Sequence, residues 1–483
     1  MKVYIYYIYK NVLVDNGIIN TENMDTNDSV YVNWDENESI SLKELLTYAL
    51  TKNWIDMDKL TAEKYSSLQE AYDSLLEYIS NYISNDTGFG KKVYRYMISS
   101  GSISGWEVCM MLYEQGVLEP SGSAYEGLSS GRMSAYDFMI NAITEKTITP
   151  AQLALEPCSG SAVVADPDTG ELLALVSYPG YDNNRLSGTV DKDYYEQLRN
   201  DKAKPLINKA TSLRTAPGSI FKPCSAITGL EQGVISTGES IVCTGQYTAV
   251  TPSPKCWIYP RSHGAENVST AIRDSCNVFF YTVGHRLGME SGGTYNSTKG
   301  TDLLKNYAEQ LGLATKSGVE IYEMDPHPSD RDAVASAIGQ GTHAYSAINL
   351  CRYVSTLATS GVCHDFTLVS KITDYNGNVI RDNEPVVSNT MNVSSSTWNA
   401  VHQGMRLVIE NTASFKGLPY QAAGKSGTAQ ENTNKADHIT FISYAPYDNP
   451  EVAVSVLIPN GYASSNAAKL TSDIYKIYWG LDK

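Results

Sequence analysis

A serine and a lysine three positions apart, Ser219 and Lys222, are the side chains of this sequence best suited to covalent chemistry. If a helix begins here, positions i and i+3 share one face, so the hydroxyl and the amine can meet. The amine can then take the hydroxyl proton and create a nucleophile. The partial positive charge at a helix N-terminus also favours the alkoxide. The spacing therefore predicts a serine nucleophile with a lysine base.

A bare Ser-x-x-Lys pair is weak support, because most such pairs lie on solvated helix faces. The flanking residues strengthen it: Pro217-Gly218 comes directly before the pair, and an apolar segment, 224–230, follows it. A helix that is apolar all round is buried. We therefore expect the pair at the buried start of a helix.

Two further polar motifs follow along the chain, Ser275-x-Asn277 and Lys425-Ser426-Gly427-Thr428. Each alone has an ordinary explanation, the first as a polar spot on a helix and the second as a turn that enters a strand. All three motifs in this order form a specific set, known in penicillin-binding proteins and class A β-lactamases. The set predicts an acyl-transfer site built from distant parts of the chain.

On these motifs the chain resembles the class B penicillin-binding proteins, peptidoglycan D,D-transpeptidases related to the septal, cell-division enzyme. The resemblance covers about residues 150–483, including Gly339-Gln340-Gly341 and the last β-hairpin. It implies a serine acyl-enzyme that cross-links stem peptides of the D-Ala-D-Ala type and is acylated by β-lactams.

The resemblance also implies a role for each motif residue. Ser219 is the acylated nucleophile, and Lys222 accepts its proton. Ser275 relays a proton toward the leaving amine, and Asn277 holds the substrate backbone.

The third motif supplies the substrate-binding strand. Lys425 sets the electrostatics of the site, the strand 426–429 (Ser426, Gly427, Thr428, Ala429) binds the donor peptide, and Thr428 binds its terminal carboxylate. The backbone N–H groups of Ser219 and Thr428 form the oxyanion hole.

The base must be neutral before it can take a proton. An ordinary lysine has a pKa of about 10.4. A lysine that acts as a base near neutral pH therefore needs its pKa lowered by about 3 units, or roughly 4 kcal/mol. Burial of Lys222 and the nearby cation Lys425 both lower its pKa.

Three positions depart from the family pattern: Ile220 stands where threonine is usual, Cys276 is the middle of the second motif, and Ser426 replaces a threonine. None of these changes removes a catalytic group. The family also carries a membrane anchor and a pedestal domain, and neither is visible before Met1, so we expect an N-terminally truncated or soluble form. The family implies a location on the extracytoplasmic face of the bacterial membrane, and cell-division or glycosyltransferase partners that act through the anchor.

Composition and charge exclude several classes of protein. The chain has 483 residues and a net charge of −16, which argues against nucleic acid as a partner. No stretch resembles a transmembrane helix of about 20 apolar residues. The apolar residues 3–9 lack a signal-peptide cleavage site, and their tyrosine, isoleucine and valine content predicts a strand.

The periodicity of the chain predicts two domains. Residues 1–149 form a mainly helical module without a catalytic constellation, with a Gly/Ser-rich loop at 121–131. Residues 150–483 form an α+β domain, in which hairpins near both ends imply a five-stranded antiparallel sheet flanked by helices. A single helix, 268–287, is expected to carry the second motif.

The eight cysteines include no Cys-x-x-Cys pair, which excludes a zinc ribbon or a thioredoxin motif. Cys243 and Cys256 flank a turn-rich loop, and a disulfide or two unpaired buried thiols are equally good interpretations. A metal site made of Cys243, Cys256, His263 and Cys276 is the least favoured alternative, because the histidines show no ligand spacing. We expect no cofactor and no metal.

Three alternative functions remain open. A class A β-lactamase needs a Glu-x-x-Leu-Asn segment, and 309–313 does not fit that pattern. A non-catalytic β-lactam sensor would keep the serine and the lysine. A third hypothesis makes the helical residues 1–149 the main working part, as a surface that docks a partner protein.

Overall fold

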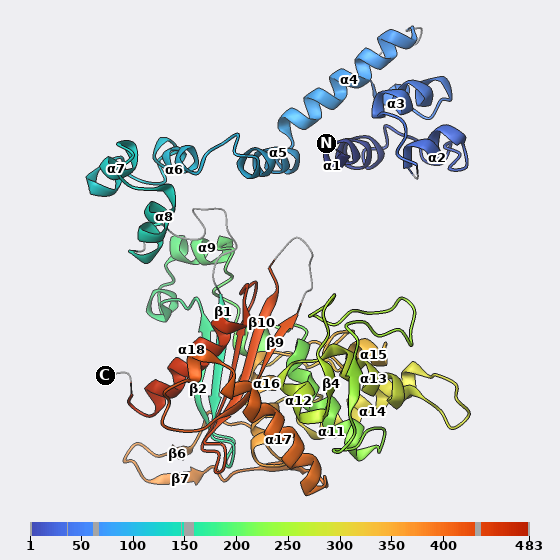
Figure 1. The fold of residues 1–483 in the computed structure, drawn as a ribbon. Coiled ribbons are helices and arrows are strands. Elements are labelled where there is room, and N and C mark those ends of the chain that lie inside the picture. Colours follow the sequence, from blue (N-terminus) through green and yellow to red (C-terminus); the bar gives the residue numbers. More distant parts are fainter. Residues whose placement is uncertain are drawn as a thin grey trace. The chain divides into compact units, whose positions relative to one another are not determined.

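The computed structural model describes residues 2–35, 37–60, 67–145, 147–148, 159–429 and 436–481. The chain divides into two compact units, residues 1–153 and 154–483 (Figure 1). The domain boundary predicted after residue 149 lies outside the described residues.

The second unit is built on a five-stranded antiparallel sheet with the strand order β2-β1-β11-β10-β9. This sheet confirms the predicted α+β fold. Its strands come from the two ends of the unit, which is why hairpins appear at both ends of the sequence pattern. The strands are β1 (Gly160–Ala165), β2 (Leu172–Tyr178), β9 (Ala423–Ala429), β10 (His438–Ala445) and β11 (Val452–Ile458).

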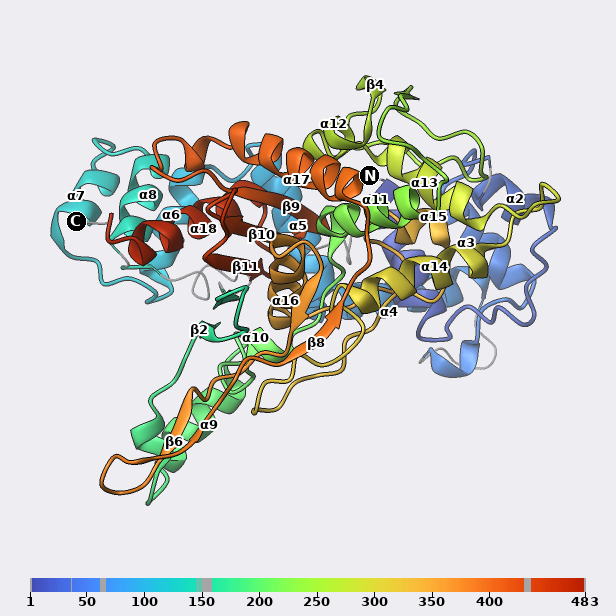
Figure 2. The ribbon, with the colours of Figure 1, turned by 90° about the horizontal axis from the view of Figure 1, so that it is seen from below.

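Helices cover both faces of the sheet, so its central strands are apolar on both sides (Figures 1 and 2). On β11, Ala453 and Leu457 belong to the larger core, which includes α16 (Ala347–Ala358). Val454 belongs to the smaller core, which includes α18 (Ser464–Tyr478). This double burial holds β10 and β11 rigidly and leaves β9 as the edge strand beside the site.

Two segments bring the other motifs to that edge. A 3-10 turn, Gly218–Phe221, leads into α11 (Lys222–Glu231), of which all but the last two residues are buried. Glycine is required at position 218, where φ is +56° and an added Cβ would lie 2.4 Å from the carbonyl oxygen of Thr428. The start of the Ser-x-x-Lys helix therefore lies directly against β9.

The single helix predicted over 268–287 is wrong. The structure has α12 (Val268–Arg273) and α13 (Asn277–Gly288), with Ser275 between them at φ +52°. The N–H of Ser275 donates to the carbonyl of Ile272, and the N–H of Cys276 donates to the carbonyl of Ala271. These two bonds form a Schellman motif, which ends a helix at a left-handed residue. The periodicity continued across the break, so the pattern alone did not reveal it.

A second, small sheet pairs β3 (Ile241–Cys243) with β4 (Gly264–Glu266). Cys243 lies opposite Gly264, next to His263 in the chain. The N–H of Cys256 donates to the carbonyl of Gly245, which returns the loop between the two strands toward Cys243.

The first unit is helical throughout its described elements, which confirms the predicted helical module. The helices that bear on the predictions are α1 (Lys2–Tyr7), the π-helix Ile8–Val14, α5 (Thr87–Ser99), α6 (Gly105–Glu114), α7 (Gly122–Ser129) and α8 (Ala135–Thr144). Others are α2 (Ser29–Asp35), α3 (Leu42–Thr51) and α4 (Leu68–Asn85).

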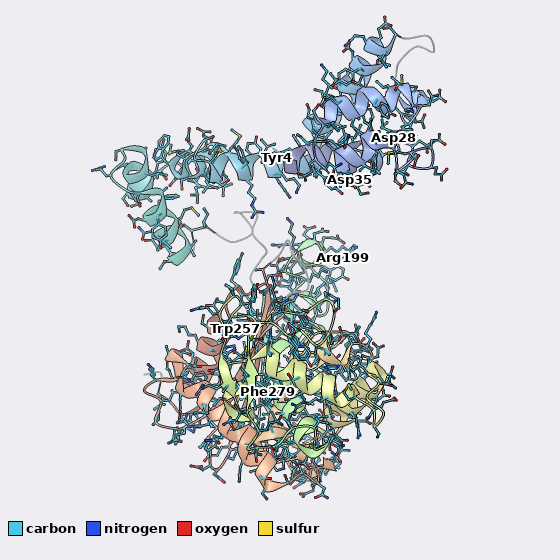
Figure 3. All side chains as sticks on the ribbon, turned by 45° about the vertical axis from the view of Figure 1, so that its right-hand side comes forward. Tyr4, Asp28, Asp35, Arg199, Trp257 and Phe279 are labelled. Carbon is cyan, nitrogen blue, oxygen red and sulfur yellow. The ribbon has the colours of Figure 1, made fainter. Side chains whose placement is uncertain are left out.

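Two sequence predictions for this unit are wrong. The expected strand at 3–9 is helical, because Tyr9, Val12 and Leu13 bury one helical face. The ring of Tyr4, which is labelled in Figure 3, packs on the ring of Phe89 at a centroid distance of 6.1 Å. Tertiary packing overrides the strand preference of such residues.

The expected loop at 121–131 contains α7, because this short helix has a packing partner. The Tyr125 ring lies 4.9 Å from that of Tyr113, and Trp106 Nε1 donates to the carbonyl of Leu128. Among the described residues of the whole chain, no helix combines the length and the apolar character that a bilayer crossing requires.

Candidate active site

A cleft of about 760 Å³ opens where the Ser-x-x-Lys turn, the break between α12 and α13, and β9 meet. Members of all three motifs line it: Ser219, Ser275, Asn277, Ser426 and Thr428. The structure therefore brings residues far apart in the sequence to one place.

Lys222 is fully buried and is held from three directions. Its Nζ donates to the carbonyl oxygen of Ser275 at 2.8 Å, to Ser275 Oγ at 3.0 Å and to Asn277 Oδ1 at 2.7 Å. Burial, and then the charge of Lys425, hold the pKa of Lys222 well below its ordinary value. A lysine in this setting gives up its proton readily and can act as a base.

Lys425 lies on β9 and is 1% exposed. Its Nζ donates to Ser275 Oγ at 3.3 Å and to the carbonyl oxygen of Ser426 at 3.0 Å. Burial lowers the pKa of Lys425 to about 7. The Ser275 hydroxyl thus lies between two amines, a position from which it can pass a proton in either direction.

Ser219 lies on the 3-10 turn, is half-buried and lines the cleft. The backbone beside it is fixed by the N–H of Gly218, which donates to the carbonyl of Gly339 at 3.0 Å. The helix itself begins at Lys222, three residues after the position expected from the sequence.

The strand β9 alternates along the third motif. Lys425, Gly427 and Ala429 are buried, Ser426 is half-buried and Thr428 is exposed. Among the described residues, β9 is the last strand of the sheet and pairs only with β10, so its other edge has no strand partner, the arrangement to which an extended peptide can add. Gly427 and Ala429 do not line the cleft among the described residues.

Several residues that line the cleft were not found from the sequence. Trp257 and Asp274 belong to no motif, whereas Gln340, which also lines the cleft, lies in the Gly-Gln-Gly loop that the family resemblance includes. Arg273 Nη2 lies 2.6 Å from Asp274 Oδ2. Burial raises the pKa of the neighbouring Glu266 to about 7. The others that line the cleft are Arg273, Ile338, Asp437 and Ser464.

A cluster of metal-ligand side chains lies directly behind the second motif. One donor atom each from Cys243, Cys256, His263 and Cys276 lies within 4.8 Å of the others. The sulfurs of Cys243 and Cys256 are each 3.6 Å from His263 Nδ1. A sulfur and a nitrogen bound to one tetrahedral Zn²⁺ are separated by about 3.6 Å.

The cysteines of this cluster are buried free thiols, so the structure contains no disulfide between Cys243 and Cys256. A hydrogen bond from the thiol of Cys276 lowers the pKa of Cys256 below its ordinary value. The geometry therefore fits the metal site that the sequence favoured least. Its ligands could not be recognised by spacing, because they come from the end of β3, from two places in the loop between β3 and β4, and from the residue before α13.

Comparison with known proteins places the cleft in a family. The model of the penicillin binding protein transpeptidase domain matches residues 160–476. Peptidoglycan D,D-transpeptidase MrdA of Haemophilus influenzae is 29% identical over 362 residues, which are 67% of this chain and 53% of that protein. The chain thus spans about half the length of this relative.

Solved structures agree on the fold. The crystal structure of Pseudomonas aeruginosa PBP2 in complex with WCK 5153 superimposes with a TM-score of 0.58 and 26% identity, over 66% of this chain and 71% of that chain. A chain of a peptidoglycan synthase complex that coordinates polymerization and crosslinking has a TM-score of 0.59 and 26% identity, over 67% and 56%. Nothing in these matches supports the septal subtype expected from the sequence.

Proposed function

The chain belongs to the penicillin-binding protein transpeptidase family, and from this premise we propose that it is a peptidoglycan D,D-transpeptidase that acts through an acyl-Ser219 intermediate. The observation that carries the proposal is the contact of buried Lys222 with both Ser275 and Asn277, beside the open edge of β9. The donor is a stem peptide that ends in D-Ala-D-Ala, and β-lactams acylate the same serine.

Acylation begins when Ser219 Oγ attacks the carbonyl carbon of the penultimate D-Ala. Lys222 takes the hydroxyl proton, which passes through Ser275 to the nitrogen of the departing D-Ala as the peptide bond breaks. A positioned base is typically worth about 10²–10⁴ in rate. An acceptor amine then attacks the ester, loses a proton by the same route, and releases the Ser219 hydroxyl.

The remaining roles follow from charge and strand geometry. The N–H groups of Ser219 and Thr428 stabilise the tetrahedral oxyanion, and each such donor is worth about 2.7–4 kcal/mol. The donor peptide extends along the open edge of β9, with Asn277 on its backbone. Thr428 binds its terminal carboxylate, and the buried Lys425 sets the electrostatics of the site.

We also propose a location and a class of partner. A peptidoglycan substrate requires the enzyme to act on the extracytoplasmic face of the bacterial membrane. The likeness to a chain of a peptidoglycan synthase complex supports a glycosyltransferase partner, and a cell-division partner is the alternative.

Transpeptidation of a defined donor tests the function. A donor that ends in D-Ala-D-Ala, supplied with an amine acceptor, should release D-Ala and form the cross-linked amide. A β-lactam sensor would bind penicillin but release no D-Ala. A β-lactamase would hydrolyse nitrocefin with rapid deacylation, and either result would overturn the proposal.

We propose in addition that Cys243, Cys256, His263 and Cys276 hold one structural Zn²⁺. Four protein ligands close the tetrahedral shell and leave no open position for a substrate, so the ion would stabilise the fold and take no part in acyl transfer. The backbone N–H of Asn277 donates to the sulfur of Cys256 at 3.3 Å, an outer contact of the kind that orients metal ligands.

Metal analysis of the purified chain tests this site. The proposal expects one zinc per chain, lost in His263→Ala and retained in His327→Ala, an exposed histidine away from the cluster. Purified protein without zinc that also fails to bind added Zn²⁺ would contradict it.

A further inference from the structure

The turn that carries Ser275 has an unfavourable backbone conformation. Ser275 has φ +52° at the left-handed position of the Schellman motif that ends α12. Glycine is the usual residue there, because a side chain in this conformation is strained. A strained residue of this kind persists only where surrounding contacts hold it.

One such contact comes from Trp257. Its Nε1 donates to the carbonyl oxygen of Asp274 at 3.0 Å, on the residue directly before Ser275. The indole ring lies 5.5 Å from the ring of His263 and is labelled in Figure 3. Trp257 is 63% exposed and lines the cleft, so the ring is not held in position by burial in a hydrophobic core.

The second contact comes from the residue before Trp257. The sulfur of Cys256 accepts the backbone N–H of Asn277 at 3.3 Å. Two consecutive residues of one loop therefore hold the backbone on both sides of Ser275. Lys222 contacts the backbone between them, through the carbonyl oxygen of Ser275.

We propose that Cys256 and Trp257 form a clamp that keeps the Ser275 turn in its left-handed conformation and thereby sets the distances from Lys222 to Ser275 and Asn277. Both are positioning residues: they act through the second motif and do not touch the reacting atoms. The expected effect on the acylation rate rests on the proposed function, whereas the expected effect on the backbone conformation of the turn does not.

The indole N–H is the group to remove. Trp257→Phe keeps an aromatic ring at the cleft and deletes the donor. Loss of one well-placed hydrogen bond should slow the acylation rate constant for fluorescent penicillin about tenfold. The dissociation constant of the non-covalent complex should stay near the wild-type value, because the ring remains.

Trp106→Phe is the matched control. Trp106 Nε1 also donates to a backbone carbonyl, that of Leu128 at 2.9 Å, in the other unit of the chain. This variant should be acylated at the wild-type rate. Hydrogen–deuterium exchange should show faster exchange at 274–277 in Trp257→Phe and no change there in Trp106→Phe.

Each result decides the proposal. A Trp257→Phe variant with wild-type acylation and wild-type exchange overturns it. So does a variant in which only penicillin binding weakens, since that assigns the indole to ligand contact. If the wild-type chain is not acylated at all, the proposed function fails, and the exchange at 274–277 alone decides the clamp.

Discussion

At the scale of single residues, the site is a set of buried amines around one hydroxyl. Two lysines reach Ser275 Oγ, at 3.0 Å from Lys222 and 3.3 Å from Lys425. Two charged amines this close in a buried site repel each other, so burial and mutual repulsion favour the neutral form of at least one. The lowered pKa of Lys222 fits its role as the base of the proposed reaction.

Lys222→Met should slow acylation by fluorescent penicillin by about 10²–10⁴, because the side chain keeps its bulk and loses the base. Thermal unfolding of the variant should show that it is folded. Lys209→Met is the matched control, since Lys209 is also buried, at 4% exposure, and burial lowers its pKa too. Equal acylation of the two variants would disprove the role of Lys222.

The pKa of Lys425 predicts a pH dependence of stability. The folded value is about 7, against about 10.4 in an unfolded chain. Between these values the unfolded chain binds a proton that the folded chain has released, so folding stability rises with pH. Lys425→Met lacks this group.

The Tm of Lys425→Met relative to that of the wild type should therefore be highest at and below about pH 7 and should fall as the pH rises toward about 10. Thermal unfolding across this range gives the measurement. A gap that is constant with pH would show that Lys425 keeps an ordinary pKa in the folded protein.

At the scale of elements, the site depends on how closely the Ser-x-x-Lys turn approaches β9. The sequence predicted both elements, because Pro217-Gly218 precedes the pair and the third motif precedes alternating apolar residues. It did not predict their distance, which depends on contacts such as Gly218 against Thr428 that no local pattern encodes.

Gly218→Ala should abolish acylation, because its Cβ would lie 2.4 Å from the carbonyl oxygen of Thr428 and push the turn off the strand. Gly233→Ala separates this clash from backbone strain: Gly233 has φ +67° and nothing within 4 Å of an added Cβ. It should lose some stability and remain fully acylated. Penicillin labelling and thermal unfolding of both variants test this, and an acylated Gly218→Ala variant would contradict it.

The break at Ser275 shows the limit of periodicity. Apolar residues continue at helical spacing from α12 into α13, so the pattern predicted one helix. The turn depends on Schellman hydrogen bonds and on contacts from Trp257 and Lys222, which come from distant parts of the chain. The zinc-ligand cluster escaped prediction for the same reason.

At the scale of the whole molecule, two compact units have separate cores. The core of the second unit spans both faces of one sheet, and the first unit has two smaller cores of its own. The α+β fold and the helical module followed from the sequence, because hairpins and amphipathic helices are local signals. The strand assigned to 3–9 failed because its partners, such as Phe89, lie far along the chain.

The central claim is that Ser219 carries the acyl group. Intact-protein mass spectrometry after treatment with penicillin, followed by peptide mapping, tests it most directly. The account predicts one adduct of the mass of the whole antibiotic, on the peptide that contains Ser219, and no adduct on Ser219→Ala. An adduct on another residue, or undiminished labelling of Ser219→Ala, would contradict it.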